Sequence, residues 1–180
     1  MKKILLLAWL ASACALAQNE AGVADPATLP PPAPPACDGE QHRQFDFWLG
    51  EWNVSVNGKA AGFNRITLLY GKCALQEDWT SAGGNFAGGS LNIYDRAKDR
   101  WHQTWVDSTG TLLELDGGLV EGKMVLSGQR PGADGSMTTN RISWTPNADG
   151  SVRQHWETST DGAHWESLFD GLYVRAEGAE

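Results

Sequence analysis

Two carboxylates in this chain have neighbours suited to acid–base chemistry. Glu77 lies between Leu75 and Trp79 in an alternating run, and Asp107 ends a run that contains Trp105. If both side chains point into a folded domain, apolar walls raise their pKa values and the pair can exchange protons with a substrate. Asp107 also precedes turn residues, and a cap for that turn is the favoured interpretation. We therefore assign no catalytic residue and keep Glu77 and Asp107 as candidates.

Polar and aromatic residues alternate on the segments around these carboxylates. Residues two apart on a strand share a face, so one face of four segments carries both indoles and hydrogen-bonding groups. Such a mixture is typical of a pocket for a small hydrophobic or aromatic molecule. In the alternative, the tryptophans fill the interior as core. The candidate ligand-binding residues are Glu77, Trp79, Gln103, Trp105, Asn140, Gln154 and Trp156.

One segment does not reveal which of its faces is buried. In residues 89–95, Leu91 and Ile93 alternate with Asn92 and Tyr94. Either pair can face the interior, and a slip of one residue inverts the assignment.

The histidines offer a cofactor alternative. His155 alternates with Arg153 and Glu157, and His164 follows the turn residues Asp161 and Gly162. A histidine ligates haem only inside a large apolar pocket, so haem through His155 or His164 is the minor alternative and no cofactor or metal is expected. The sequence also lacks the Gly-x-Ser-x-Gly, His-Glu-x-x-His and phosphate-loop motifs.

The elements that must position these residues are strands. Period-two runs separated by Gly, Asn and Asp turns predict ten strands with short connections. Strands joined in sequence order close most simply into an up-and-down antiparallel β-barrel, because closure removes exposed edges. Residues 41–49 predict a short helix that plugs one end. The predicted strands are 51–56, 64–70, 74–80, 89–95, 100–107, 111–119, 123–129, 138–145, 151–159 and 165–175.

The first 36 residues predict export. Lys2 and Lys3, an apolar stretch and small residues up to Ala17 are typical of a signal peptide, which we place at residues 1–17. Residues 18–36 form a proline-rich linker, and residues 37–180 form the barrel domain. We expect a periplasmic or secreted protein without a membrane span. Lipidation at Cys14 is the alternative.

Cysteines and charge agree with export. Without the signal peptide, Cys37 and Cys73 remain as an even pair, which predicts a disulfide in an oxidising compartment. The full chain carries 14 basic and 22 acidic residues, a net charge of −8. This net negative charge repels the phosphate backbone of a nucleic acid, so we expect no nucleic-acid partner.

Several motifs resemble known barrel families. Gly50, Glu51 and Trp52 resemble the Gly-x-Trp signature of lipocalin and calycin barrels, which implies that Arg175 covers Trp52 at the closed end, with Trp48 beside it. FDFWLGEW at residues 45–52, YDRAKDRWHQTWVDSTG at 94–110 and FDGLYVR at 169–175 resemble a family of secreted bacterial proteins of unknown function with a lipocalin-like barrel. A haem site would make the chain similar to the nitrobindin-like barrels.

Three functions therefore remain open. A barrel that binds a small hydrophobic or aromatic ligand is favoured. The alternatives are an isomerase or hydrolase that uses an inward carboxylate, and a ligand-free interaction module of the cell envelope.

Overall fold

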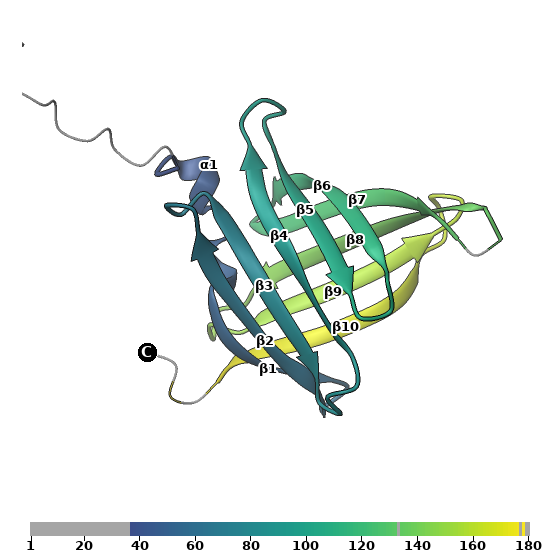
Figure 1. The fold of residues 1–180 in the computed structure, drawn as a ribbon, viewed down its shortest axis with the longest axis horizontal. Coiled ribbons are helices and arrows are strands. Elements are labelled where there is room, and N and C mark those ends of the chain that lie inside the picture. Colours follow the sequence, from purple (N-terminus) through teal and green to yellow (C-terminus); the bar gives the residue numbers. More distant parts are fainter. Residues whose placement is uncertain (1–36, 133, 177, 179–180) are drawn as a thin grey trace, which may run out of the picture. The chain divides into compact units, whose positions relative to one another are not determined.

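The computed structural model describes residues 37–132, 134–176 and 178. The predicted signal peptide, the proline-rich linker and Cys14 lie outside the described residues. The described part is an antiparallel barrel (Figure 1). Its strands are β1 (Gly50–Val56), β2 (Lys59–Leu69), β3 (Ala74–Ser81), β4 (Ala87–Asp95), β5 (Arg100–Asp107), β6 (Leu112–Val120), β7 (Lys123–Pro131), β8 (Met137–Pro146), β9 (Val152–Ser159) and β10 (Glu166–Arg175).

The predicted ten-stranded, up-and-down barrel is confirmed. Each strand pairs with the next one in sequence, and β1 pairs with β10 to close the ring. The largest boundary error concerns β2, which begins at Lys59 rather than Asn64. Asn57 and Gly58 both have positive φ values, of 50° and 73°, and this tight hairpin lets pairing resume at once after the turn.

The predicted helix at residues 41–49 is wrong in extent. The segment forms a short helix, α1 (Glu40–Arg43), and a separate 3₁₀ turn, η2 (Asp46–Trp48). Phe45 interrupts the helix with φ −105° and ψ 5°. The break allows both Phe45 and Trp48 to be fully buried.

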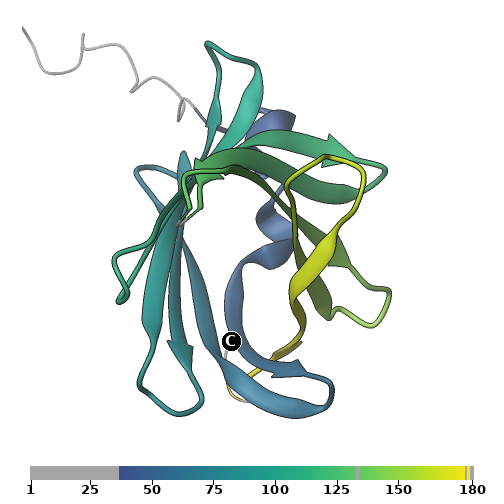
Figure 2. The same cartoon turned by 90° about the vertical axis from the view of Figure 1, so that its right-hand side faces the viewer.

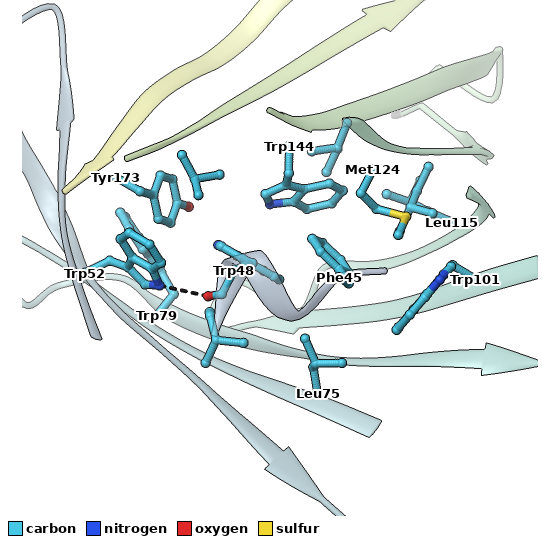
Figure 3. Packing of buried hydrophobic residues seen from close by; sticks show 14 of the residues in the cluster. Phe45, Trp48, Trp52, Leu75, Trp79, Trp101, Leu115, Met124, Trp144 and Tyr173 are labelled. Carbon is cyan, nitrogen blue, oxygen red and sulfur yellow. Dashed lines mark hydrogen bonds between the residues drawn. The ribbon is translucent and has the colours of Figure 1, made fainter. Parts of the chain in front are cut away.

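Aromatic rings fill the barrel at the end that carries η2. Trp48 stacks on Phe45 with ring centroids 4.9 Å apart, and Phe45 meets Trp101 and Trp144 edge-on at 5.6 and 5.1 Å. Trp52 donates its indole N–H to the Trp48 carbonyl at 2.9 Å (Figure 3). These five side chains, which we call the closed-end core, are at most 1% exposed.

Arg175 closes the outer side of this core. Its guanidinium lies 4.1 Å from the centre of the Trp52 ring and donates to the Leu49 carbonyl at 2.6 Å. The position agrees with what the lipocalin resemblance implied. A guanidinium covers an indole face favourably in this geometry.

The Cys37–Cys73 disulfide is present. It joins the chain ahead of α1 to the connection between β2 and β3, so the plugging segment is covalently fixed to the barrel wall. Among the described residues, no helix is long and apolar enough to cross a membrane.

Candidate functional site

A cavity of about 640 Å³ occupies the barrel at the end away from the closed-end core. Its rim comes from the connections β3–β4, β5–β6 and β7–β8, represented by Phe86, Thr111 and Gly132, and from Leu168 near the start of β10. In a view turned by 90°, the strands surround this end and the helical segment lies deeper within the ring (Figure 2). The cavity therefore lies at the end of the barrel opposite the helical segment, with residues from the loops around its rim.

All seven predicted ligand-binding residues line this cavity: Glu77, Trp79, Gln103, Trp105, Asn140, Gln154 and Trp156. Asp107 lines it as well, close to the rim. Strict alternation on β3, β5, β8 and β9 brought them to one surface. Whether they contact a ligand stays a prediction.

The structure settles the face of β4 that the sequence left open. Ser90 and Asn92 point inward and are buried, whereas Leu91 and Ile93 are exposed on the outer face. Across the ladder, Ser90 is opposite Glu77 and Asn92 is opposite Gln103. Polar residues thus meet polar residues inside the barrel.

A belt of hydrogen-bonded side chains borders the cavity, and four of its members, Glu77, Gln103, Gln154 and Tyr173, line the cavity and form its floor. We call it the polar belt; its members are Asn64, Glu77, Ser90, Asn92, Gln103, Gln154 and Tyr173. On one side of Glu77, Ser90 donates to the carboxylate at 2.7 Å. The Asn92 amide donates to the Ser90 hydroxyl at 2.8 Å, and the Gln103 amide donates to Asn92 at 2.9 Å. Donors on this side are therefore directed toward Glu77.

The other side of the belt runs through Asn64. Its amide donates to the second carboxylate oxygen of Glu77 at 2.7 Å and, more weakly, to the Tyr173 hydroxyl at 3.4 Å. Tyr173 in turn donates to Gln154. The belt thus links side chains from six strands: β2, β3, β4, β5, β9 and β10. It separates the filled end from the cavity.

Burial of Glu77 raises its pKa to about 7. Loss of hydration is the main cause, because water no longer stabilises the ionised form. The hydrogen bonds from Ser90 and Asn64 oppose the rise, and the nearby charge of Asp78 adds to it. Near neutral pH both protonation states of Glu77 are therefore populated.

Asn64 can form a hydrogen bond with either protonation state of Glu77. Its Nδ2 donates to the carboxylate, while its buried Oδ1 has no partner among the described residues. A neutral carboxyl must donate a proton rather than accept one. Turning the Asn64 amide by 180° brings Oδ1 toward Glu77, where it can accept that proton.

Tyr173 remains a neutral phenol in this belt. Burial raises its pKa well above 10, the charge of Glu77 adds to the rise, and the Asn64 hydrogen bond opposes it. At neutral pH the phenol therefore keeps its proton and donates it to Gln154.

Two glycines on the inner face of the barrel leave room for indole rings to lie against the wall. A Cβ atom at Gly62 would lie 2.6 Å from the Trp79 ring, and one at Gly88 would lie 2.5 Å from the Trp105 ring. The rings occupy the space that side chains would need there. The lumen is therefore open above the belt in spite of its aromatic content.

Side-chain contacts within the barrel wall orient the three indole groups of the cavity. Trp156 donates its N–H to Asn140 at 3.0 Å, and Trp105 donates to Asp107 at 3.1 Å. Trp79 meets the Phe169 ring edge-on at 6.1 Å. The walls thus present apolar ring surface, while the N–H groups of Trp105 and Trp156 bond to protein.

Asp107 has the turn-capping role that the sequence favoured. One carboxylate oxygen accepts from the Thr109 amide at 2.8 Å, the Thr109 hydroxyl at 2.6 Å and the Thr111 amide at 3.2 Å. Partial burial acts to raise its pKa, but the bonds from Thr109, Trp105 and Thr111 outweigh this and hold the pKa at about 2. A carboxylate held ionised in this way is a poor proton acceptor near pH 7.

The two haem candidates lie away from the cavity. His155 bonds to Ser167 at 3.1 Å, and the exposed His164 bonds to Asp161 at 2.7 Å. Neither residue belongs to the cavity lining. Within residues 37–132, 134–176 and 178, no cluster of three or more His, Cys, Asp or Glu residues has the arrangement of a metal site.

Sequence reasoning missed four belt residues, Asn64, Ser90, Asn92 and Tyr173. A signal for Tyr173 was present, because it shares a strand face with Arg175. For Ser90 and Asn92 the signal was their position opposite Glu77 and Gln103, which follows only once the strand register is known.

Comparisons with known proteins do not identify the site. No family model matches this chain, and no curated protein matches it. The geometry of the floor and walls is therefore the basis on which a function can be argued.

Proposed function

We propose that this barrel binds a small, largely apolar or aromatic molecule in the cavity above the polar belt. The observation that carries the proposal is the cavity itself. Its volume of about 640 Å³ falls within the roughly 300–1,000 Å³ of small-molecule sites. Trp79, Trp105 and Trp156 form its walls, and the belt supplies a few polar groups at one end.

The open lumen favours binding over a filled barrel. The closed-end core already provides the packed interior that the fold needs. Burying apolar ring surface of a ligand against the walls is favourable at roughly 25 cal/mol per Å². We propose that the protein is exported and binds its ligand as a lipocalin-like barrel. The Cys37–Cys73 disulfide and the signal-peptide pattern support export.

Native mass spectrometry of the protein purified from its own host, and a thermal-shift screen of aromatic and lipid compounds, test the proposal. We expect a copurified small molecule or a ligand that raises the melting temperature, since binding to the folded state alone stabilises it. An empty protein whose tryptophan fluorescence and melting temperature respond to no compound would overturn it.

A cavity-filling variant locates the binding. Thr138 lines the cavity, while Thr139 points to the outer face of the same strand, where Gln129 bonds to it. Thr138→Trp should weaken any ligand found at least about tenfold, and the matched Thr139→Trp should leave affinity unchanged. Equal effects of the two variants would place the binding elsewhere.

A second candidate function uses Glu77 as a general base. The favouring observation is a carboxyl group on the cavity floor whose pKa is about 7, close to the optimum for proton transfer at neutral pH. The corresponding reaction is abstraction of a proton from a bound substrate, as in an isomerisation. Glu77→Gln should abolish any turnover found while leaving the fold intact, and unchanged turnover would refute the role.

A further inference from the structure

The floor of the cavity holds an acid with no cation beside it. In the part of the chain that the structure describes, no Lys or Arg forms an ion pair with Glu77. The other charged residues of the cavity lining are Asp107 and Arg130, and both belong to strand ends at the rim. A ligand that reaches the floor therefore meets the Glu77 carboxyl without a compensating positive charge.

Most donors of the polar belt are already engaged within it. Asn64 donates to Glu77, Ser90 donates to Glu77, and Tyr173 donates to Gln154. Each oxygen of the Glu77 carboxylate accepts one of these bonds and keeps a further lone pair.

Gln103 and Gln154 complete the polar surface of the floor. Gln103 donates its amide N–H groups to Asn92 and, more weakly, to Ser90 at 3.3 Å, which leaves its carbonyl oxygen as an acceptor. Gln154 accepts from Tyr173 through its carbonyl and keeps its amide NH2 group as the one donor group of the floor. The floor thus presents mainly acceptors, and its complement is a ligand group that donates.

We propose that the ligand of this site is an arylalkylamine, an aromatic ring system that carries its amine on an aliphatic carbon, with its ammonium group against Glu77 and its ring system against Trp79, Trp105 and Trp156. This inference rests on the proposed binding function and names its ligand class. The ammonium supplies the missing positive charge and up to three donors. Indole faces attract the same cation, and the net charge of −8 favours its approach.

The same geometry rejects a carboxylate ligand in this orientation. An anionic head group at the floor would lie against Glu77, and two like charges in a poorly hydrated site repel strongly. A neutral hydroxyl can donate one bond to Glu77 without the charge. The order of affinity is therefore amine, then alcohol, then acid.

Three probes with one ring system test this order by isothermal titration calorimetry. We use biphenyl-4-methylamine, biphenyl-4-methanol and biphenyl-4-carboxylic acid at pH 8, where Glu77 is mainly ionised. The amine should bind about tenfold more tightly than the alcohol, as expected for a charge-assisted hydrogen bond, and the acid should bind most weakly.

Variants assign the preference to Glu77. Glu77→Gln should remove the tenfold advantage of the amine and leave the affinity for the alcohol within about threefold. Glu114→Gln removes an exposed carboxylate from the outer face of β6 and serves as the matched control; it should retain the full advantage of the amine.

A pH series gives an independent readout. Between pH 6 and pH 8 the affinity of the native protein for the amine should rise as Glu77 ionises, and Glu77→Gln should show no such rise. The groups that face Glu77 from other strands, Asn64, Ser90 and Tyr173, carry no charge in this range, and the charged neighbour on its own strand is Asp78.

The outcomes separate the ligand class from the binding function. Equal affinity for amine and alcohol, or an amine advantage that survives in Glu77→Gln, would overturn the class while leaving binding in the cavity intact. Absence of binding for all three probes would overturn the ligand class, and the native mass spectrometry and compound screen described above decide the binding function separately.

Discussion

At the scale of single residues, two carboxylates illustrate how environment sets chemistry. Glu77 is surrounded by barrel interior and its pKa rises to about 7, whereas Asp107 accepts several hydrogen bonds at a turn and its pKa falls to about 2. The sequence offered both as acid–base candidates. Only Glu77 changes protonation near neutral pH.

Glu77 should make the stability of the protein depend on pH. Its carboxyl ionises near 4.5 when unfolded and near 7 when folded. Unfolding between these pH values releases a proton, so the free energy of unfolding falls as pH rises through this window and is level above it. The total loss is about 3 kcal/mol. Urea unfolding of the native protein and of Glu77→Gln, from pH 4.5 to 8, measures it.

In that experiment Glu77→Gln should lack this decline, so the native protein loses stability relative to the variant as pH rises. Glu114→Gln, which changes an exposed carboxylate, should follow the native protein. Parallel curves for the native protein and Glu77→Gln would contradict the assignment.

Asp107→Ala should destabilise the β5–β6 turn. The substitution removes the acceptor for two backbone amides and one hydroxyl, which we expect to lower the free energy of unfolding by about 1–2 kcal/mol. At pH 7 the loss should be complete, because the folded carboxylate loses its proton far below that pH. Denaturant unfolding of the variant checks this, and an unchanged midpoint would refute the capping role.

At the scale of elements, Gly50 couples the plugging segment to the barrel. It is the first residue of β1, separated from the end of η2 by Leu49, and has φ 122°; a Cβ atom there would clash with Arg175 Nη1. The residue therefore allows both an unusual backbone turn and the close approach of the guanidinium that covers Trp52.

Gly50→Ala should lower the free energy of unfolding by about 2–4 kcal/mol, because it adds backbone strain and displaces Arg175 from the Leu49 carbonyl. Gly118→Ala is the control: nothing lies within 4 Å of its Cβ position, so we expect a change within about 1 kcal/mol. Urea unfolding measures both.

A double variant separates the two causes. In an Arg175→Ala background the clash is absent, so the additional cost of Gly50→Ala should shrink to the backbone strain alone. Equal costs in the two backgrounds would show that Arg175 contributes nothing to the requirement for glycine.

At the scale of the whole molecule, one barrel contains two different interiors. The closed-end core is packed with aromatic rings, and the polar belt divides it from an open cavity. None of the five side chains of the closed-end core lines the cavity, whereas Trp79, Ile142 and Tyr173 belong both to the buried apolar cluster and to the cavity lining.

The seam between β1 and β10 should form late in folding. These strands are the most distant pair in sequence; Arg175 bonds to Leu49 across 126 residues. Closing so long a loop costs entropy before contacts compensate for it, whereas β7 and β8 pair through a short connection.

Stopped-flow kinetics with two core variants test this order. Val54→Ala in β1 should mainly accelerate unfolding, with a φ-value near zero, and Leu126→Ala in β7 should slow folding, with a higher φ-value. A φ-value for Val54 equal to or above that for Leu126 would contradict late closure.

The sequence was sufficient to predict many site residues, because strand periodicity is a local property. Alternation placed Glu77, Gln103 and Gln154 on one surface without knowledge of the fold. It left open which face of β4 points inward, and the structure shows that Leu91 and Ile93 are exposed. Their face was set by pairing with β3 and β5, which is not local.

Ten strands, their order, the disulfide and eight of the residues that line the cavity were predictable from the sequence, because turn chemistry, cysteine pairing and period-two patterning need no knowledge of the tertiary structure. Three properties could be seen only in the folded barrel: the open lumen, the joining of Asn64 and Tyr173 with Glu77 in one belt, and the rise of the Glu77 pKa to about 7. Those properties depend on barrel closure, which brings side chains from β2, β3 and β10 together and removes them from water. The volume of the lumen and the desolvation of Glu77 depend on many residues that are distant in sequence, so no single segment determines them.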